Sequence, residues 1–335
     1  MNYEQFVSLA QNFLAHCFTE LKSKHFTIEN HWHIDHLCFR TESDQRYEEL
    51  KQEFSHFSTL LIESEVNGRL ISTFKLSTPL NYEGFDIDLL ELPAPKKGKV
   101  VKEGFEHFEI VSDLSFQELK GRFKNITIDE SGTKKLFNKE LEFCFDGFAI
   151  KFHHQSLESV INFENNHAVD NILKETQILK TLEDLNPLVV NTFLLGIAQE
   201  SSDLDILVQY DKNEEYKNFM TLHLKHLPNF KIEQFETRHQ TSILTSFDYK
   251  GLSFEIFAQE IPATKQVAYR HFLAEERLLK LGGSLFKEKI LTLRKQGLKT
   301  EPAFAKALNL AGDPFEELLK LQTYSNSDLK FLFKD

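Results

Sequence analysis

The sequence predicts an α+β protein of two domains, and two observations carry that prediction. A β-α-β-β-β order of elements occurs twice before about residue 160, which indicates paired βαβββ modules. After a polar stretch at residues 158–167 the order changes to an α/β pattern that ends in a helical region of about 70 residues. A length of 335 residues suits two domains of roughly 150 residues each. We therefore expect one domain at residues 1–160 and a second at residues 168–335.

The elements of the first domain follow from the spacing of its apolar residues. Helical spacing predicts a helix over residues 3–23, ahead of the first repeat. The first repeat is a strand, a polar helix and three strands, at residues 33–41, 43–57, 58–66, 69–77 and 84–93. The second repeat has the same order, with a faint third element, at residues 104–112, 115–123, 125–128, 139–147 and 148–154.

The second domain has no repeat. Its expected helices and strands alternate at residues 169–182, 187–195, 202–210, 214–227, 230–238, 242–249 and 252–259, before the helical region. Two helix starts are predicted there. One has Thr300 as its cap, and the other lies at Asp313-Pro314, where Asp313 is the cap and Glu316 the capping-box acid.

Composition excludes several classes of protein. The net charge of −12 repels phosphate backbones, which argues against non-specific nucleic-acid binding. Cys17, Cys38 and Cys144 form no CxxC pair and no even disulfide framework, so they are expected as free thiols in a reducing cytoplasm. Neither a signal peptide nor an apolar run of ~20 residues is present, so we expect no membrane partner. The oligomeric state is not indicated.

Polar residues stand among apolar neighbours in four strands of the first domain. Residues two apart in a strand share a face. If the two repeats pair into one curved sheet, one group of polar side chains converges, namely His36, Arg40, Glu91, His107, Glu109 and Lys151.

Four segments in this domain carry a family resemblance: IDHLCFRT, LLELPAPK, EHFEIV and AIKFHHQSLESVI. They resemble the YecM-like branch of the vicinal oxygen chelate superfamily over about residues 1–160. The resemblance implies that a divalent metal is held from the first, fourth, fifth and eighth strands, which places ligands at His36, Glu91, His107 and Lys151. Lysine departs from this pattern, because a protonated amine has no lone pair for a metal.

Three interpretations of these residues stay open. In the first, His36, Glu91 and His107 bind a divalent transition metal. In the second, the histidines are structural and Lys151 pairs with Glu91. In the third, a metal-free pocket that includes Arg40, Glu109 and Lys151 binds a small molecule.

Carboxylates gather in two strands of the second domain. In SSDLDILVQY, Asp203 and Asp205 share one strand face, and Glu255 is the lone acid of the apolar strand LSFEIFAQ. Three carboxylates on neighbouring strands concentrate negative charge. A folded protein tolerates that charge best by binding a hard cation such as Mg²⁺, whose remaining positions substrate phosphates occupy.

Longer strings in this half, SFEIFAQEIPATKQVAYRHFLAEERLL and GLKTEPAFAKALNLAGDPFEELLKL, resemble an uncharacterised bacterial family of the polymerase-beta-like nucleotidyltransferase superfamily over about residues 168–322. The resemblance implies that Asp203 and Asp205 hold Mg²⁺ and that Glu255 is the third catalytic acid. The superfamily's Gly-Ser pair falls at Asn191-Thr192, so the glycine is missing. Asn is the non-glycine residue that best tolerates left-handed geometry, so the loop can survive the loss of the glycine.

The sequence thus predicts a cytoplasmic, Mg²⁺-dependent nucleotidyltransferase fused to a metal-binding or small-molecule-binding domain. Its partners are a nucleoside triphosphate, contacted by Thr192, Ser202 and Arg270, and a small-molecule hydroxyl acceptor. The alternative is a non-catalytic binding or regulatory protein built from two degenerate enzyme folds. The acceptor, the base preference and the metal of the first domain are not indicated.

Overall fold

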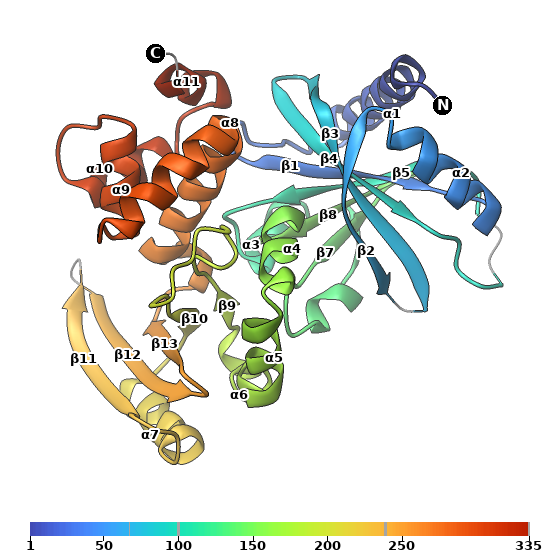
Figure 1. Ribbon diagram of the computed structural model, residues 1–335. Helices are drawn as coiled ribbons and strands as arrows, with labels where there is room; N and C mark the ends of the chain where they lie inside the picture. The colour runs from blue at the N-terminus through green and yellow to red at the C-terminus, as the bar shows by residue number, and fades with distance from the viewer. Residues whose placement is uncertain (67, 99–100, 238–239, 334–335) are drawn as a thin grey trace. The chain divides into compact units, whose positions relative to one another are not determined.

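The computed structural model describes residues 1–66, 68–98, 101–237 and 240–333 (Figure 1). The chain divides into two compact units. The N-terminal unit comprises residues 1–112, 116–135 and 139–157, and the C-terminal unit comprises residues 113–115, 136–138 and 158–335. Both units mix helices with a β-sheet, which confirms the predicted α+β class.

The N-terminal unit contains both predicted βαβββ modules. A helix, α1 (Tyr3–Ser23), precedes them. The first module consists of β1 (His33–Arg40), α2 (Asp44–Phe54), β2 (Ser58–Val66), β3 (Arg69–Tyr82) and β4 (Phe85–Pro93). The second consists of β5 (Gly104–Val111), α3 (Phe116–Arg122), β6 (Thr127–Asp129), η1 (Ser131–Lys134), β7 (Leu141–Cys144) and β8 (Ala149–His153).

The two modules form one eight-stranded sheet in the order β2-β3-β4-β1-β5-β8-β7-β6. The first strand of each module pairs antiparallel with the other, β1 with β5, at the centre of the sheet. Each of these strands also pairs in parallel with the last strand of its own module, β1 with β4 and β5 with β8. The four strands predicted to carry the polar residues are therefore the four central ones.

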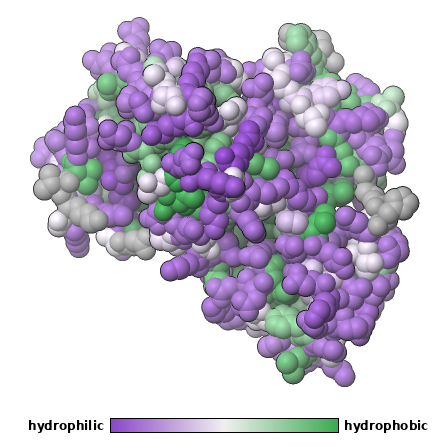
Figure 2. All heavy atoms as spheres, turned by 180° about the vertical axis from the view of Figure 1, so that it is seen from behind, coloured by the Kyte–Doolittle hydropathy of each residue, from purple (hydrophilic) through white to green (hydrophobic). Residues whose placement is uncertain are grey.

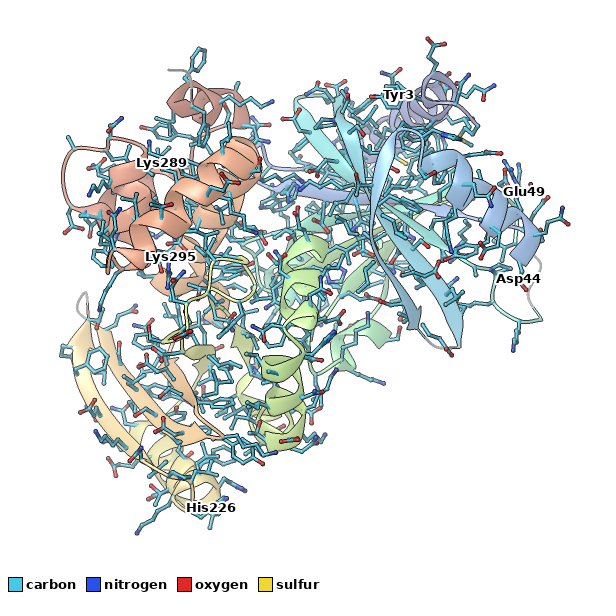
Figure 3. All side chains as sticks on the ribbon, viewed as in Figure 1. Tyr3, Asp44, Glu49, His226, Lys289 and Lys295 are labelled. Carbon is cyan, nitrogen blue, oxygen red and sulfur yellow. The ribbon has the colours of Figure 1, made fainter. Side chains whose placement is uncertain are left out.

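Aromatic packing separates the two faces of this sheet. Phe39 and Phe74, from β1 and β3, contact the ring of Phe54 in α2, and Phe108 of β5 stacks with Phe18 of α1. The helices therefore cover the face that carries the large apolar side chains. Strand alternation leaves the polar residues for the other face. Figure 3 shows Asp44 and Glu49 on the outer side of α2, where they are exposed.

The C-terminal unit is built on a five-stranded mixed sheet in the order β11-β12-β13-β10-β9. Its strands are β9 (Leu188–Val189), β10 (Leu204–Gln209), β11 (Lys231–Thr237), β12 (Gln240–Tyr249) and β13 (Leu252–Gln259). The central pair, β10 and β13, is parallel. Leu204, Ile206, Phe254 and Ile256 are fully buried, so the residues between them face the other side of the sheet.

The helices of this unit lie before, within and after the strands of the sheet along the chain. Before it lie α4 (Leu157–Asn165), α5 (His167–Thr176), α6 (Ile178–Thr181) and η2 (Glu183–Leu185), and α7 (Asn213–Leu224) lies between β10 and β11. After it come η3 (Ala263–Lys265), α8 (Val267–Lys295), α9 (Thr300–Ala307), α10 (Pro314–Leu321), α11 (Asn326–Lys330) and η4 (Phe331–Phe333). The helical region is confirmed, and α8 is kinked where Gly283 takes a φ of 65°.

The polar stretch at residues 158–167 is mostly helical, in α4 and the start of α5. Two local predictions are wrong. The strand expected over residues 187–195 is only two residues long, because the chain turns at residues 192–196. At α9 the cap is Lys299, not Thr300. The predicted start of α10 is correct, since the Asp313 side chain accepts hydrogen bonds from the backbone N–H groups of Phe315 and Glu316.

Hydrophobic residues form scattered areas on the mostly hydrophilic face seen in Figure 2. This agrees with a chain in which 27% of residues are charged. None of the helices in the described part of the chain combines the length and the apolar character that a membrane span requires.

Replacing Phe54 tests the aromatic core of the N-terminal unit. The Phe54 ring is fully buried and contacts the rings of Phe6, Phe39 and Phe74. Phe54→Ala should lower the free energy of unfolding by about 3–5 kcal/mol, because it removes apolar contacts and leaves a cavity. Urea denaturation followed by circular dichroism measures the loss. The control, Leu60→Ala, alters a side chain that is 42% exposed and should change stability by less than about 1 kcal/mol.

Candidate functional site

Two β-bulges determine the direction in which the His36 and His107 side chains point. Between Ile34 and Leu37, β1 has one residue more than β5 opposite it. Between Phe105 and His107, β5 has one residue more than β1. Bulges re-aim side chains, and they are frequent beside functional sites. Here they let an acid bond to the histidine that follows it in sequence, although neighbours in a regular strand point to opposite faces.

Each histidine is held by the acid before it. Nδ1 of His36 lies 2.9 Å from an Asp35 carboxylate oxygen, and Nδ1 of His107 lies 2.9 Å from Glu106. Asp35 is fixed in turn by the backbone N–H of Leu157, at 2.9 Å. A carboxylate on one ring nitrogen fixes the tautomer and aims the other nitrogen, which is the usual second-shell arrangement of a metal-binding histidine.

The aimed nitrogens are buried and unsatisfied. His36 and His107 are 2% and 5% exposed, and within the described part of the chain Nε2 of each has no hydrogen-bond partner. Glu91 of β4 joins them: His36, Glu91 and His107 each offer a ligand atom within 4.8 Å of the others. The structure therefore brings three of the four residues of the expected ligand set to one place.

Lys151, the fourth residue of that set, lies beside two other carboxylates. Its Nζ is 3.5 Å from Glu109 and 3.8 Å from Glu140. Among the residues that the structure describes it forms no ion pair with Glu91, so the pairing expected in the second interpretation is wrong. The register explains this, because Lys151 stands directly opposite Glu109 in the parallel β5–β8 pair.

Glu109 is the centre of this charged cluster. Its Oε1 lies 3.6 Å from Nε2 of His36 and 3.4 Å from Nε2 of His107, and its Oε2 lies 2.6 Å from Nε2 of His153. Burial works to raise the pKa of Glu109, but His36, His153 and Lys151 outweigh it and hold the pKa well below the ordinary value. Glu109 is therefore ionised.

The surrounding charges also govern the basic groups. Burial works to lower the pKa of His36, but Glu109 and Asp35 outweigh it and raise that pKa well above the ordinary value. Burial likewise works to lower the pKa of Lys151, but Glu109 and Glu140 outweigh it and raise that pKa. Lys151 is thus a permanent cation, whereas a metal would have to replace the protons of the histidines.

Arg40 contacts the acid that positions His107. Its guanidinium pairs with Glu106. Burial works to raise the pKa of Glu106, and His107 and Arg40 outweigh it and lower that pKa. Arg40 therefore supports the orientation of His107.

Several members of this site are absent from the set predicted from the sequence. One of them is His153, which is only 4% exposed and contacts Glu109. Asp35, Glu106 and Glu140 were not singled out. A signal for two of them exists, because each module begins with an acid–histidine dipeptide, Asp35-His36 in one and Glu106-His107 in the other. Cys38 also lies at the site, in a group with Glu106 and His107.

The C-terminal carboxylates meet on the central strand pair. Asp205 of β10 stands opposite Glu255 of β13 in parallel register, and Asp203 directly precedes β10. Within the described residues, the groups whose ligand atoms all lie within 4.8 Å of one another belong to the N-terminal unit. The three carboxylates are therefore neighbours without forming such a compact group.

Charge repulsion acts on all three acids. Burial, then Glu255 and Asp203, raise the pKa of Asp205 well above its ordinary value. Burial and Asp203 also raise the pKa of Glu255, while Lys299 acts against them. The pKa of Asp203 is raised as well, chiefly by burial. In the described part of the chain no ion pair compensates these carboxylates, so the region favours a cation.

The loop before β10 contains the predicted nucleotide contacts. The Thr192 hydroxyl donates to the Ser202 hydroxyl at 3.1 Å, and the Ser202 hydroxyl accepts the backbone N–H of Gln199 at 2.8 Å. Asn191 does not use its tolerance of left-handed geometry, because it has no positive φ. Its side chain instead accepts the backbone N–H of Leu194 at 3.0 Å, and its buried Nδ2 lacks a hydrogen-bond partner among the described residues.

Arg270 lies in α8 and contacts a residue outside the carboxylate group. Its Nε donates to the Gln322 side chain at 2.8 Å. Within the described residues it forms no ion pair with Asp203, Asp205 or Glu255. The structure thus brings Thr192 and Ser202 together but does not join Arg270 to the carboxylates.

Comparison with known families separates the two halves of the chain. Residues 2–164 match the family model described as YecM protein. Residues 171–321 match a model described as a domain of unknown function, DUF4269. The two-part composition expected from the sequence is confirmed.

Two curated relatives resemble parts of the chain. An uncharacterized protein of Haemophilus influenzae is 37% identical over 90 residues, which are 27% of this chain and 47% of that protein. Protein YecM of Escherichia coli is 29% identical over 145 residues, which are 39% of this chain and 77% of that protein. The chain thus spans about half the length of the Haemophilus relative.

Solved structures align with parts of the chain at low TM-scores. A structural-genomics protein has a TM-score of 0.40 and 26% identity over 47% of this chain and 90% of its own. The Cid1 poly(U) polymerase bound to MgGTP has a TM-score of 0.31 and 16% identity, and the match covers 44% of this chain and 48% of that chain. A Streptomyces coelicolor methylmalonyl-CoA epimerase has a TM-score of 0.28 and 14% identity, and the match covers 36% of this chain and 95% of that chain.

Replacing Asp205 distinguishes a strained site from a structural one. Its folded-state pKa exceeds the unfolded value, so its contribution to stability is present below the unfolded pKa and is lost as pH rises through the folded pKa. In chelator-treated buffer at neutral pH, Asp205→Asn should therefore be at least as stable as the wild type, and its relative advantage should grow with rising pH. Thermal melting from acid to neutral pH measures this. A loss of about 3–5 kcal/mol would mean that Asp205 belongs to a structural buried pair.

Proposed function

We propose that the C-terminal unit is a Mg²⁺-dependent nucleotidyltransferase that acts on a small-molecule hydroxyl. The observation that supports this most is the parallel register of Asp205 with Glu255, beside Asp203, with raised pKa values and no compensating ion pair in the described residues. A site whose carboxylates repel one another gains most from a hard divalent cation.

Each residue has a defined role in this proposal. Asp203 and Asp205 would hold Mg²⁺, which stabilises the charge of the attacking and leaving oxygens in a phosphoryl displacement. Glu255 would accept the proton of the acceptor hydroxyl, a task that its raised pKa favours. The hydroxyl oxygen forms a bond to the α-phosphorus, the bond to the β-phosphate oxygen breaks, and pyrophosphate leaves. Thr192 and Ser202 supply hydroxyls for phosphate oxygens.

A specific observation favours a second function, in the N-terminal unit. The Nε2 atoms of His36 and His107 are buried, oriented by carboxylates, and unsatisfied in the described part of the chain. A divalent transition metal fits these nitrogens together with Glu91. The bound metal would supply a Lewis acid for the oxygen atoms of a small molecule. The opposing hypothesis is a non-catalytic protein in which both sites are degenerate.

Binding of a nucleoside triphosphate tests the first proposal. With Mg²⁺, a triphosphate at 100 times its dissociation constant should stabilise the C-terminal unit by about 2.7 kcal/mol in a thermal-shift experiment. Asp203→Asn and Asp205→Asn should abolish the shift. The control, Asp211→Asn, changes an exposed acid of the same unit and should retain it. If no triphosphate raises the melting temperature of the wild type, the result favours the non-catalytic hypothesis.

Metal analysis tests the second proposal. The purified chain should retain close to one transition-metal ion per molecule by elemental analysis, and His107→Ala should lose it because one of the aimed nitrogens is gone. His154→Ala is the matched control, since the neighbouring His154 ring stacks on Phe116 and belongs to none of the ligand groups in the described residues. Equal metal content in the wild type and His107→Ala would contradict the assignment.

A further inference from the structure

We propose that Glu109 is a ligand of the N-terminal metal and takes the position that Lys151 cannot fill. This inference rests on the proposed metal site and identifies one more residue of it. The family pattern places the last ligand on β8, where this chain has Lys151, whose amine forms ion pairs with Glu109 and Glu140. Glu109 on the neighbouring strand β5 offers a carboxylate oxygen in its place.

The distances around Glu109 suit a shared ion better than hydrogen bonds. Its Oε1 lies 3.6 Å from Nε2 of His36, 3.4 Å from Nε2 of His107 and 3.5 Å from Nζ of Lys151. Protein N–H···O bonds measure about 2.7–3.2 Å, so all three separations are long. Two ligand atoms at about 2.1 Å from one tetrahedrally coordinated ion lie roughly 3.4 Å apart, which is close to the separations of both histidines.

The two oxygens of Glu109 have different surroundings. Oε2 is 2.6 Å from Nε2 of His153, which holds the carboxylate in place from β8. Oε1 is thereby directed to the side where His36 and His107 present their unsatisfied nitrogens. A carboxylate anchored through one oxygen and open at the other is suited to bind a metal through a single atom.

Charge balance accounts for the buried lysine. A cation beside a metal site is costly unless carboxylates compensate it. Lys151 contacts Glu109 and Glu140, and Glu91 lies with the histidines. These three carboxylates together balance a divalent ion and the lysine. Lys151 is therefore the counter-charge of the ligand Glu109 and does not need to bind the metal.

Paired substitutions in the full chain test this inference. Metal is removed with a chelator, and the affinity for Zn²⁺ is measured by competition with a chromogenic chelator. Glu109→Gln should weaken binding by more than about 100-fold, because it removes a charged ligand, whereas outer-shell changes typically cost about 10–100-fold. Glu140→Gln is the matched control: Glu140 also contacts Lys151 and His153, and as an outer-shell residue it should cost no more than about 10–100-fold.

Visible absorption of bound Co²⁺ gives a second readout that does not depend on activity. Glu109→Asp keeps the charge but retracts the oxygen, so it should alter the Co²⁺ spectrum even if Glu109→Gln fails to fold. An unchanged spectrum and affinity in both Glu109 variants would overturn the inference while leaving the site of His36, Glu91 and His107 intact. Equal losses in Glu109→Gln and Glu140→Gln would also overturn it. A wild type that binds neither ion would remove the proposed metal function itself.

Discussion

The two bulges in the β1–β5 pair are the constraint on which the N-terminal site depends. In regular strands the acid and the histidine of each Asp-His or Glu-His dipeptide would point to opposite faces. The extra residues bring Asp35 onto Nδ1 of His36 and Glu106 onto Nδ1 of His107. Both Nε2 atoms are thereby aimed at one place beside Glu109. Because each bulge lies in a different strand, the two modules contribute equivalent halves.

The two units treat buried charge in opposite ways. In the N-terminal unit, carboxylates and basic groups alternate around Glu109, so its pKa falls and the cluster is held by attraction. In the C-terminal unit, Asp205 and Glu255 face each other in register without a paired cation among the described residues, and their pKa values rise. The first arrangement is stable as it stands and preorganises nitrogen ligands. The second is strained and favours a hard cation.

Several features could be predicted because they depend only on local pattern. Period-two alternation located the four polar strands, and the repeat of β-α-β-β-β implied that they lie together. The same alternation placed Asp203 and Asp205 on one face and singled out Glu255. Other features could not be predicted. The pairing of Lys151 with Glu109 is a matter of register between β5 and β8, and the turn at residues 192–196 shortened a strand whose composition was mostly apolar.

The sequence by itself determined the two-part α+β organisation and assigned His36, Glu91, His107, Asp205 and Glu255 to their strands, because hydrophobic periodicity is a local property of the chain. Only the tertiary structure decided which side chains meet. In the structure Glu109 lies at the centre of the N-terminal cluster and His153 is a buried member of it. Arg270 contacts Gln322 and forms no ion pair with the C-terminal carboxylates among the described residues. The physical reason is that register and bulges follow from pairing between distant strands, and the alternation within a single strand does not report them.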